Sequence, residues 1–134
     1  MYTSVNSRVA SAYQKIGAES RVMGASAHGL VQVLFDEFFV AMTMAREGLR
    51  NKDRVLKAKK IALAGRILQG GLLESLDMEA GGELALNLRA LYNYCLQRLT
   101  WANLRDDEEA LAEVVRLIEP VAQGWKQIEG EAHV

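Results

Sequence analysis

The sequence has only one cysteine, one proline and two histidines among its 134 residues. The single cysteine, Cys95, cannot form a disulfide within the chain, which agrees with a reducing compartment. The histidines, His28 and His133, lie far apart, and neither has a Cys or carboxylate cluster at the spacing of metal ligands. The Glu-x-x-His pairs of di-iron bundles are absent as well. We therefore expect no metal, no cofactor and no catalytic residues, and we place an enzyme last among the function classes.

An excess of one charge and a long hydrophobic run are also missing. Lys and Arg number 16 against 17 Asp and Glu, so the chain has no basic field that would attract nucleic acid. The longest apolar runs are far shorter than the roughly 18 residues that cross a bilayer, and residues 1–6 lack the pattern of a secretory signal. We expect a cytoplasmic protein that has no nucleic-acid partner and does not insert into membranes.

What the sequence has instead is a composition typical of a folded domain. Half of the residues are hydrophobic and a quarter are charged, and the length suits one domain. Clusters of Gly, Ser, Asn and Asp divide the chain into a tail and four long segments, none with a strand pattern. The prediction is an all-α fold in which residues 27–129 form an antiparallel up-down four-helix bundle. Residues 1–26 are expected to be a mobile N-terminal tail with a short helix, and residues 130–134 a C-terminal tail.

Capping residues indicate where the helices begin. Ser26 and Asp53 are expected to cap the first two helices, and Asp106 with Glu109 resembles a capping box at the start of the fourth. The stretch 77–82 is expected to be a turn. The four helices are expected to run from Ser26 to about Arg50, from Asp53 to about Leu76, from about Glu83 to Asn103, and from Asp106 to near Glu129.

Three of the four expected helices carry two apolar faces. At about 100° per residue, the wider faces contain Leu30, Leu34, Phe38, Ala41 and Ala45 in the first helix, Ile61, Gly65, Leu68, Leu72 and Leu76 in the second, and Leu84, Leu88, Leu91, Cys95, Leu99 and Ala102 in the third. The second faces contain Val33, Val40 and Met44, then Leu56, Leu63 and Ile67, and then Leu86, Ala90, Tyr94 and Trp101. The fourth helix has one broad apolar arc.

A four-helix bundle needs about one apolar face per helix, so the second faces are surplus. Contact with several neighbouring helices is the ordinary explanation for any one of them, but three together favour a groove for a partner or a dimer contact. A partner that buries several such side chains gains about 1.5 to 3 kcal/mol from each. The candidates for this contact are Leu56, Leu63, Ile67, Leu86, Tyr94 and Trp101.

Three glycines, Gly65, Gly70 and Gly71, weaken the second helix, because an interior glycine costs roughly 1 kcal/mol relative to alanine. Close approach by a neighbouring helix is the ordinary explanation for them. Close approach by the backbone of a partner is the functional alternative.

Several motifs along the chain resemble the FliS family of flagellin export chaperones. They are Ala12-Tyr13-Gln14, Leu34-Phe35-Asp36, the stretch from Ser75-Leu76-Asp77 to Gly81-Gly82-Glu83-Leu84, Asn87-Leu88, Leu91-Tyr92, Arg98-Leu99, Ala102-Asn103-Leu104 and Trp125-Lys126. They occur in order and with matching spacing over nearly the whole chain, so the resemblance is much more specific than any single motif.

The resemblance implies an antiparallel helical bundle that binds the disordered C-terminal segment of newly made flagellin in the cytoplasm. Such a chaperone prevents premature polymerisation and helps to deliver flagellin to the flagellar type III export gate. Tyr13 matches the tail tyrosine of the family, which is implicated in contact with the export machinery or in docking of the tail, and we add Ile16 of the tail to the protein-binding candidates.

The alternative from a different class is a structural module whose surplus faces close a homodimer when cargo is absent. The faces separate the fourth helix from the others. If the chain is a chaperone, cargo should wrap around the first three helices and make few contacts with the outer face of the last.

Overall fold

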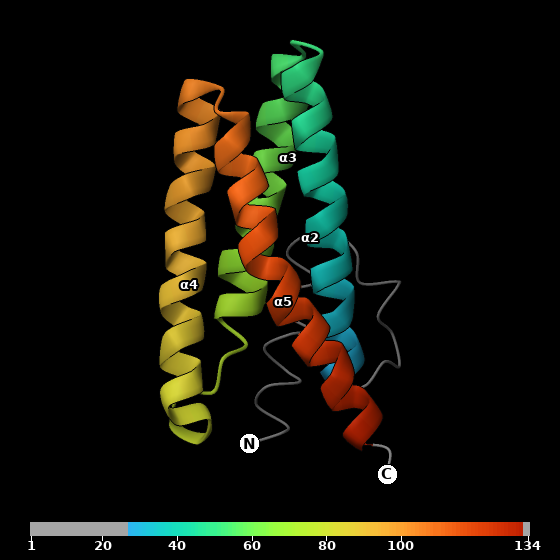
Figure 1. Ribbon diagram of the computed structural model, residues 1–134, viewed down its shortest axis with the longest axis vertical. Coiled ribbons are helices and arrows are strands. Elements are labelled where there is room, and N and C mark those ends of the chain that lie inside the picture. Colours follow the sequence, from blue (N-terminus) through green and yellow to red (C-terminus); the bar gives the residue numbers. More distant parts are fainter. Residues whose placement is uncertain (1–26, 133–134) are drawn as a thin grey trace.

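The computed structural model describes residues 27–132 of the chain, with side chains up to residue 128. Its elements are α2 (Ala27–Arg50), α3 (Arg54–Arg66), the π-helix η2 (Ile67–Leu73), α4 (Met78–Arg105) and α5 (Glu108–Ala132) (Figure 1). The predicted all-α bundle is confirmed for these residues, which contain no strand. The expected tail, with Tyr13 and Ile16, and the expected cap Ser26 lie outside the described residues.

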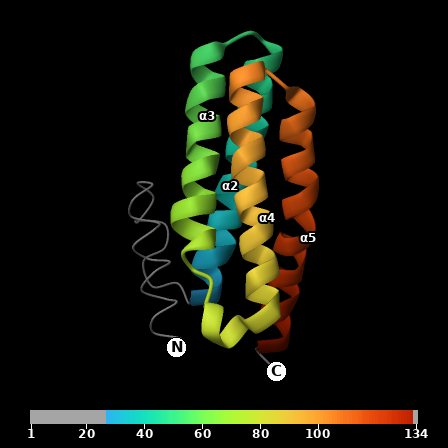
Figure 2. The same ribbon diagram turned by 90° about the vertical axis from the view of Figure 1, so that its left-hand side faces the viewer.

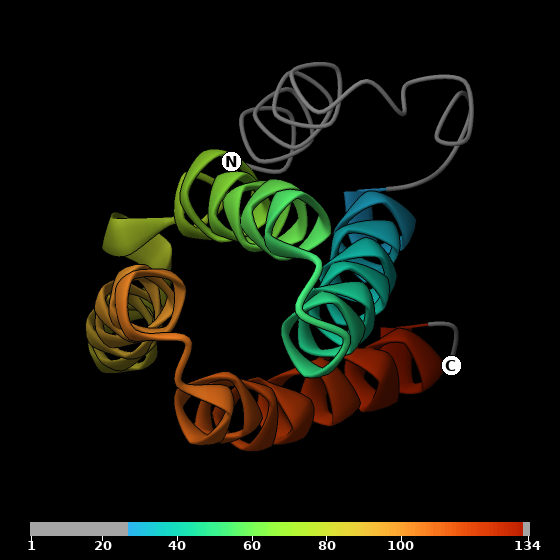
Figure 3. The same cartoon turned by 90° about the horizontal axis from the view of Figure 1, so that it is seen from above.

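Successive helices run in opposite directions along the long axis of the molecule (Figure 2). Seen from above, they form a ring in which α2 and α4 lie opposite each other, each between α3 and α5 (Figure 3). The four seams of this bundle therefore join α2 to α3, α3 to α4, α4 to α5, and α5 to α2.

Aspartates cap three helix starts, and one of them differs from the prediction. The side chain of Asp53 accepts a hydrogen bond from the backbone N–H of Leu56 at 3.1 Å, as predicted. The expected cap Asp106 is wrong, because the side chain that accepts from the Ala110 N–H, at 3.2 Å, belongs to Asp107. Asp106 instead ends α4 with a left-handed backbone, φ 52°. Two adjacent aspartates made the cap ambiguous by one position.

The stretch 77–82 is more ordered than the expected turn. Asp77 accepts hydrogen bonds from the N–H groups of Glu79 and Ala80, so that a helical turn begins at Met78. The turn is interrupted at Gly82, where φ is 54° and ψ is −129°, a conformation that glycine adopts without steric cost. The prediction of a turn was therefore wrong for the first residues and right for the break that separates them from the rest of α4.

The core contains the predicted faces of α2 and α5. All five residues of the wider face of the first helix are buried, and so are Leu111, Val114 and Ile118 of α5. Leu84, expected in the core, is instead 64% exposed. It follows the break at Gly82, and at this end of the bundle α5 leans away from α4 towards α2, so the start of α4 lacks that neighbour (Figure 1).

The second half of the expected second helix is the π-helix η2. Here Ile67, Leu68, Gly71 and Leu72 are buried. π-helical segments are rare and often lie at functional sites. At Gly71 an added Cβ would lie only 3.1 Å from Cδ1 of Leu34 in α2. Close approach by a neighbouring helix, the ordinary explanation for the glycines, therefore holds at this position.

Candidate protein-binding surface

The second apolar face of α4 lies on the outside of the bundle. Leu86, Tyr94 and Trp101 are 49%, 41% and 42% exposed. Helical spacing places them on one side of α4, together with the exposed Ala90. The structure thus brings three of the predicted candidate residues onto one surface.

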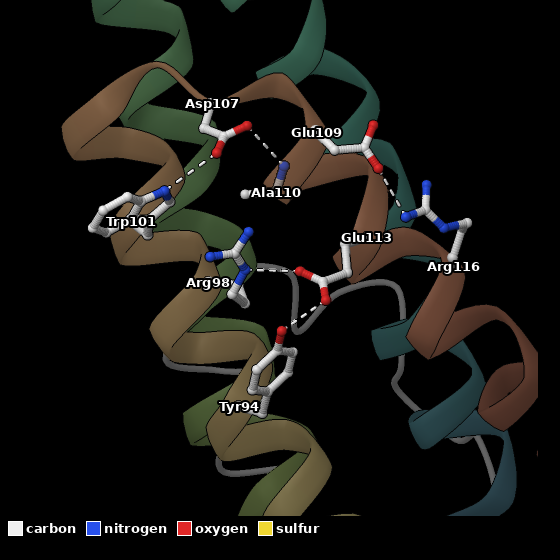
Figure 4. Close-up of polar contacts among 8 residues, drawn as sticks. All are labelled: Tyr94, Arg98, Trp101, Asp107, Glu109, Ala110, Glu113 and Arg116. Atoms are coloured by element: carbon white, nitrogen blue, oxygen red, sulfur yellow. Dashed lines mark hydrogen bonds and ion pairs between the residues drawn. The ribbon is translucent and has the colours of Figure 1, made fainter.

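Polar contacts with α5 and with the residue that caps it, Asp107, fix the aromatic residues of this surface (Figure 4). The Tyr94 hydroxyl donates to Oε2 of Glu113 at 2.7 Å, and Nε of Arg98 donates to the other oxygen of the same carboxylate, also at 2.7 Å. Nε1 of Trp101 donates to Asp107 at 3.2 Å, while the guanidinium of Arg105 lies 4.7 Å from the centre of the indole ring. The rings keep their exposed surface in a fixed orientation, which lowers the entropy cost of packing a partner against them.

The same contacts shift the protonation equilibria. The hydrogen bond from Tyr94, followed by that from Arg98, lowers the pKa of the Glu113 carboxyl. The pKa of the Tyr94 hydroxyl is raised, because the hydroxyl donates a hydrogen bond to the Glu113 carboxylate. The hydroxyl therefore stays protonated and the carboxylate ionised at neutral pH, so the bridge between α4 and α5 is intact there.

The candidates on α3 are placed differently from those on α4. Leu56 and Leu63 are half-buried. The expectation that Ile67 faces outward is wrong, because Ile67 is 0% exposed and belongs to the core.

The buried side of α3 is rotated relative to the predicted face, which was centred on Ile61 and Gly65. Lys57 and Ala64 are buried there together with Ile61. Nζ of Lys57 donates to the carbonyl of Asn103 at 3.0 Å and pairs with the Asp106 carboxylate. A helix face assigned from apolar residues alone leaves out a lysine that is buried because its ammonium group is paired. Gly65 is consequently displaced to the edge of the core.

A groove of about 660 Å³ lies between α3 and α4. Its lining is mainly apolar with a polar edge, and consists of Ile61, Ala62, Gly65, Arg66, Gln69, Leu96, Leu99, Thr100, Asn103 and Leu104. Leu104 is 74% exposed and follows Trp101 by three residues, so it links the groove to the outer face of α4. Groove and face together form one surface around α4.

Gly65 lies in the lining of this groove. A Cβ at this position would meet only Cδ2 of Leu96, at an ordinary distance of 3.9 Å. Close packing by α4 therefore does not explain Gly65, in contrast to Gly71. Apolar periodicity did not indicate the groove residues Arg66 and Leu104. The glycine inside the helix, Gly65, was the one signal in the sequence for an opening at this point.

Residues 27–132 contain no group of three or more His, Cys, Asp or Glu side chains that could hold a metal ion. Burial raises the pKa of the Cys95 thiol to about 11, and the nearby Glu113 carboxylate adds to this, so the sulfur is a neutral packing group at pH 7. None of the helices in this part of the chain is long and apolar enough to span a membrane.

His28 has a structural role at the base of the bundle. Its ring stacks on that of Trp125 with centroids 4.5 Å apart. Nε1 of Trp125 donates to the His28 carbonyl at 3.1 Å, and Nε2 of His28 lies 2.6 Å from the Trp125 carbonyl oxygen. This reciprocal pair joins the start of α2 to the last third of α5.

Fold and surface together give a helical bundle whose mainly apolar groove adjoins an exposed helix face, an arrangement typical of proteins that bind a peptide or a helical segment. Comparison with known proteins gives the family. Residues 9–132 match the family described as flagellar protein FliS. The chain therefore belongs to the FliS family of flagellar secretion chaperones, and the resemblance seen in the sequence is confirmed.

Three relatives illustrate the extent of the similarity. The flagellar secretion chaperone FliS of Salmonella typhimurium is 42% identical over 132 residues, which cover 98% of this chain and 96% of the relative. The FliS of Escherichia coli is 41% identical over 87% of this chain and 85% of its own length. FliSB of Pseudomonas aeruginosa is 39% identical over 87% of this chain and 91% of its own. The similarity extends over the whole described bundle.

Proposed function

We propose that this protein binds the disordered C-terminal segment of flagellin in the cytoplasm, prevents its premature polymerisation and helps to deliver it to the flagellar type III export gate. The observation that carries the proposal is the mainly apolar α3–α4 groove together with the exposed Leu86, Tyr94, Trp101 and Leu104 on the adjoining side of α4. A secretion chaperone needs such a surface, because its cargo must be held unfolded and released later. Tyr13 and Ile16 of the tail remain predicted contacts to the export machinery or to the binding surface.

The surface is large enough for this task in energetic terms. Ordering a disordered segment on binding costs about 2 to 5 kcal/mol. Each large apolar anchor that becomes buried contributes about 1.5 to 3 kcal/mol. Exposed Leu86, Trp101 and Leu104 supply three chaperone side chains that cargo could cover. Because these side chains are only partly exposed, three such contacts offset part of the ordering cost, and contacts inside the groove must supply the rest of the affinity.

Replacement of Leu104 tests the proposal. We expect Leu104→Ser to weaken the binding of a flagellin C-terminal fragment by roughly tenfold, because one apolar anchor of about 1.5 kcal/mol is lost. Leu104 is exposed, so the unbound bundle should keep its helicity. Isothermal titration calorimetry measures the affinity, and circular dichroism checks the fold.

The matched control is Ile128→Ser in α5, where the side chain is 48% exposed and lies outside the groove. It should leave the affinity unchanged. Equal loss in both variants would contradict the assignment of the surface. Light scattering of the same samples tests the homodimer alternative: a dimer that the fragment does not convert into a one-to-one complex would replace the chaperone by a structural module.

Delivery requires a second measurement. The complex of chaperone and flagellin fragment should be retained by the cytoplasmic domain of the export gate protein in a pull-down, and Tyr13→Ala should reduce this retention. Retention that does not depend on Tyr13 would remove that residue from the proposed contact.

A further inference from the structure

The parts of α3, η2 and α4 that border the groove contain basic residues but no acidic ones; the acidic residues of α4, Glu79 and Glu83, lie at its far end. Residues 54–73 and 84–105 contain no Asp or Glu. They contain Arg54, Lys57, Lys59, Lys60, Arg66, Arg89, Arg98 and Arg105. Helix α5 is the reverse, with Glu108, Glu109, Glu113, Glu119, Glu129 and Glu131 against Arg116 and Lys126. The nearly neutral total charge of the chain conceals this separation.

Within the basic half, the charges differ in whether they are neutralised. Lys57 pairs with Asp106, and Arg98 pairs with Glu113. Lys59 and Arg66 are exposed, and neither forms an ion pair with any residue in the described range 27–132. These two charges are therefore available to a partner.

Their position makes them one rim of the groove. Arg66 lines the groove, as does Ala62. Lys59 precedes Ala62 by three residues and Arg66 by seven, so all three lie along one edge of α3. The opposite rim, on α4, is formed by uncharged side chains, those of Thr100, Asn103 and Leu104. The groove thus has an apolar floor, one basic edge and one neutral edge.

We infer that the groove selects an amphipathic segment of the exported cargo that has an apolar face and carboxylates along one edge of it. The apolar face packs on Ile61, Leu96 and Leu99, and Gly65 lets it approach the α3 backbone. Lys59 and Arg66 lie about 10 Å apart along the helix axis, at 1.5 Å per residue. The matching carboxylates are therefore about seven residues apart if the cargo is helical there, or three if it is extended.

The charges act mainly as a filter. An exposed ion pair adds little affinity, whereas a like charge at the same place repels, so the rim discriminates between acidic and basic segments more than it strengthens binding. The inference rests on the proposed function, because the selected segment is part of the cargo. Anionic membranes and nucleic acid are poorer candidates, since the rim offers two unpaired cations beside a mainly apolar groove.

The test compares two double variants of the full chain. Lys59→Glu with Arg66→Glu reverses the rim, and Arg116→Glu with Lys126→Glu makes the same change of net charge on α5. The probes are the flagellin C-terminal fragment and two synthetic amphipathic helices, one with Glu at a spacing of seven residues and one with Lys in the same places. Affinities are measured by calorimetry at low and at high salt.

We expect the unchanged chain to prefer the Glu peptide over the Lys peptide by about tenfold at low salt, and the rim variant to reverse this preference. The α5 variant should keep the original preference, and high salt should reduce the difference in every case. An unchanged chain that binds both peptides equally, or a rim variant that behaves as the α5 variant, would overturn the inference.

The outcomes separate this inference from the proposed function. If the flagellin fragment binds and is indifferent to rim reversal, the inference fails and the proposed function stands. If the fragment does not bind to the unchanged chain at all, the proposed function fails, and with it the identity of the cargo. Binding to anionic vesicles or RNA that the rim reversal abolishes, without discrimination between the peptides, would also overturn the inference.

Discussion

Two seams of the same bundle are built in opposite ways. Between α2 and α5, Arg46 and Arg50 reach Glu108 at one end, and His28 stacks on Trp125 at the other. Between α3 and α4, a groove whose lining includes Gly65 leaves part of the seam open. The closed seam stabilises the bundle, and under the proposed function the open seam would receive the cargo without opening the core.

The largest expected effect comes from truncation on the closed side. Phe35→Ala in α2 removes a side chain that is 2% exposed and should lower the free energy of unfolding by about 3 to 5 kcal/mol. Leu96→Ala removes a half-buried side chain beside the groove and should cost roughly 1 kcal/mol. Urea denaturation followed by circular dichroism measures both. Equal losses would show that the open seam contributes to stability as much as the core does.

A smaller effect, with a difference in sign, is expected from the glycines. Gly65→Ala should raise stability by about 1 kcal/mol, because it removes the helix penalty of glycine and its Cβ meets Leu96 at an ordinary distance. Gly71→Ala should gain nothing or lose stability, because its Cβ would press on Leu34 at 3.1 Å. Thermal unfolding of the two variants compares them directly. A gain at Gly71 that matched the gain at Gly65 would refute this contrast.

The smallest effect concerns the pH dependence of the bridge between α4 and α5. The pKa of Glu113 is lower in the folded chain than its ordinary value of 4.5, because Tyr94 and Arg98 donate to it. Its stabilising contribution is therefore fully present above that ordinary value and is lost as the pH falls through the folded-state pKa. The urea midpoint of Glu113→Gln should lie below that of the unchanged chain at pH 7. The difference between the two midpoints should be smaller at pH 3.5.

The control for this measurement is Glu119→Gln. Glu119 is exposed, and its side chain has no ion pair or hydrogen bond to another residue in the described part of the chain. Its replacement should leave the pH dependence as it is. If both variants changed the pH profile alike, the effect would come from net charge and not from the bridge.

The helices and most of the core could be predicted from the sequence because apolar periodicity and capping residues are local signals. The exposed face with Leu86, Tyr94 and Trp101 was predictable for the same reason. The face of α3 was not, because its centre includes a lysine that is neutralised by the end of α4, and nothing local in the sequence indicates that pairing. Ile67 was therefore assigned outward and Gly65 inward.

The groove itself depends on the distance between two helices, which periodicity does not determine. The polar contacts of Tyr94 and Trp101 depend on the alignment of α5 with α4, which is again a tertiary property. The exposure of Leu84 likewise follows from the direction in which α5 leans. One feature of the groove can be seen in the sequence alone: residues 54–73 and 84–105 contain no carboxylates, which indicates a basic border.

The π-helix η2 has a consequence for variation in chain length. Because a π-helix bonds each carbonyl to the fifth residue onward, and an α-helix to the fourth, the segment Ile67–Leu73 holds one residue more than an α-helix needs for the same turn. Gly70 is placed in open space, with no atom within 4 Å of an added Cβ. A variant that lacks Gly70 should close the segment into a regular α-helix, so η2 is a position at which this chain should tolerate the loss of one residue and keep the groove.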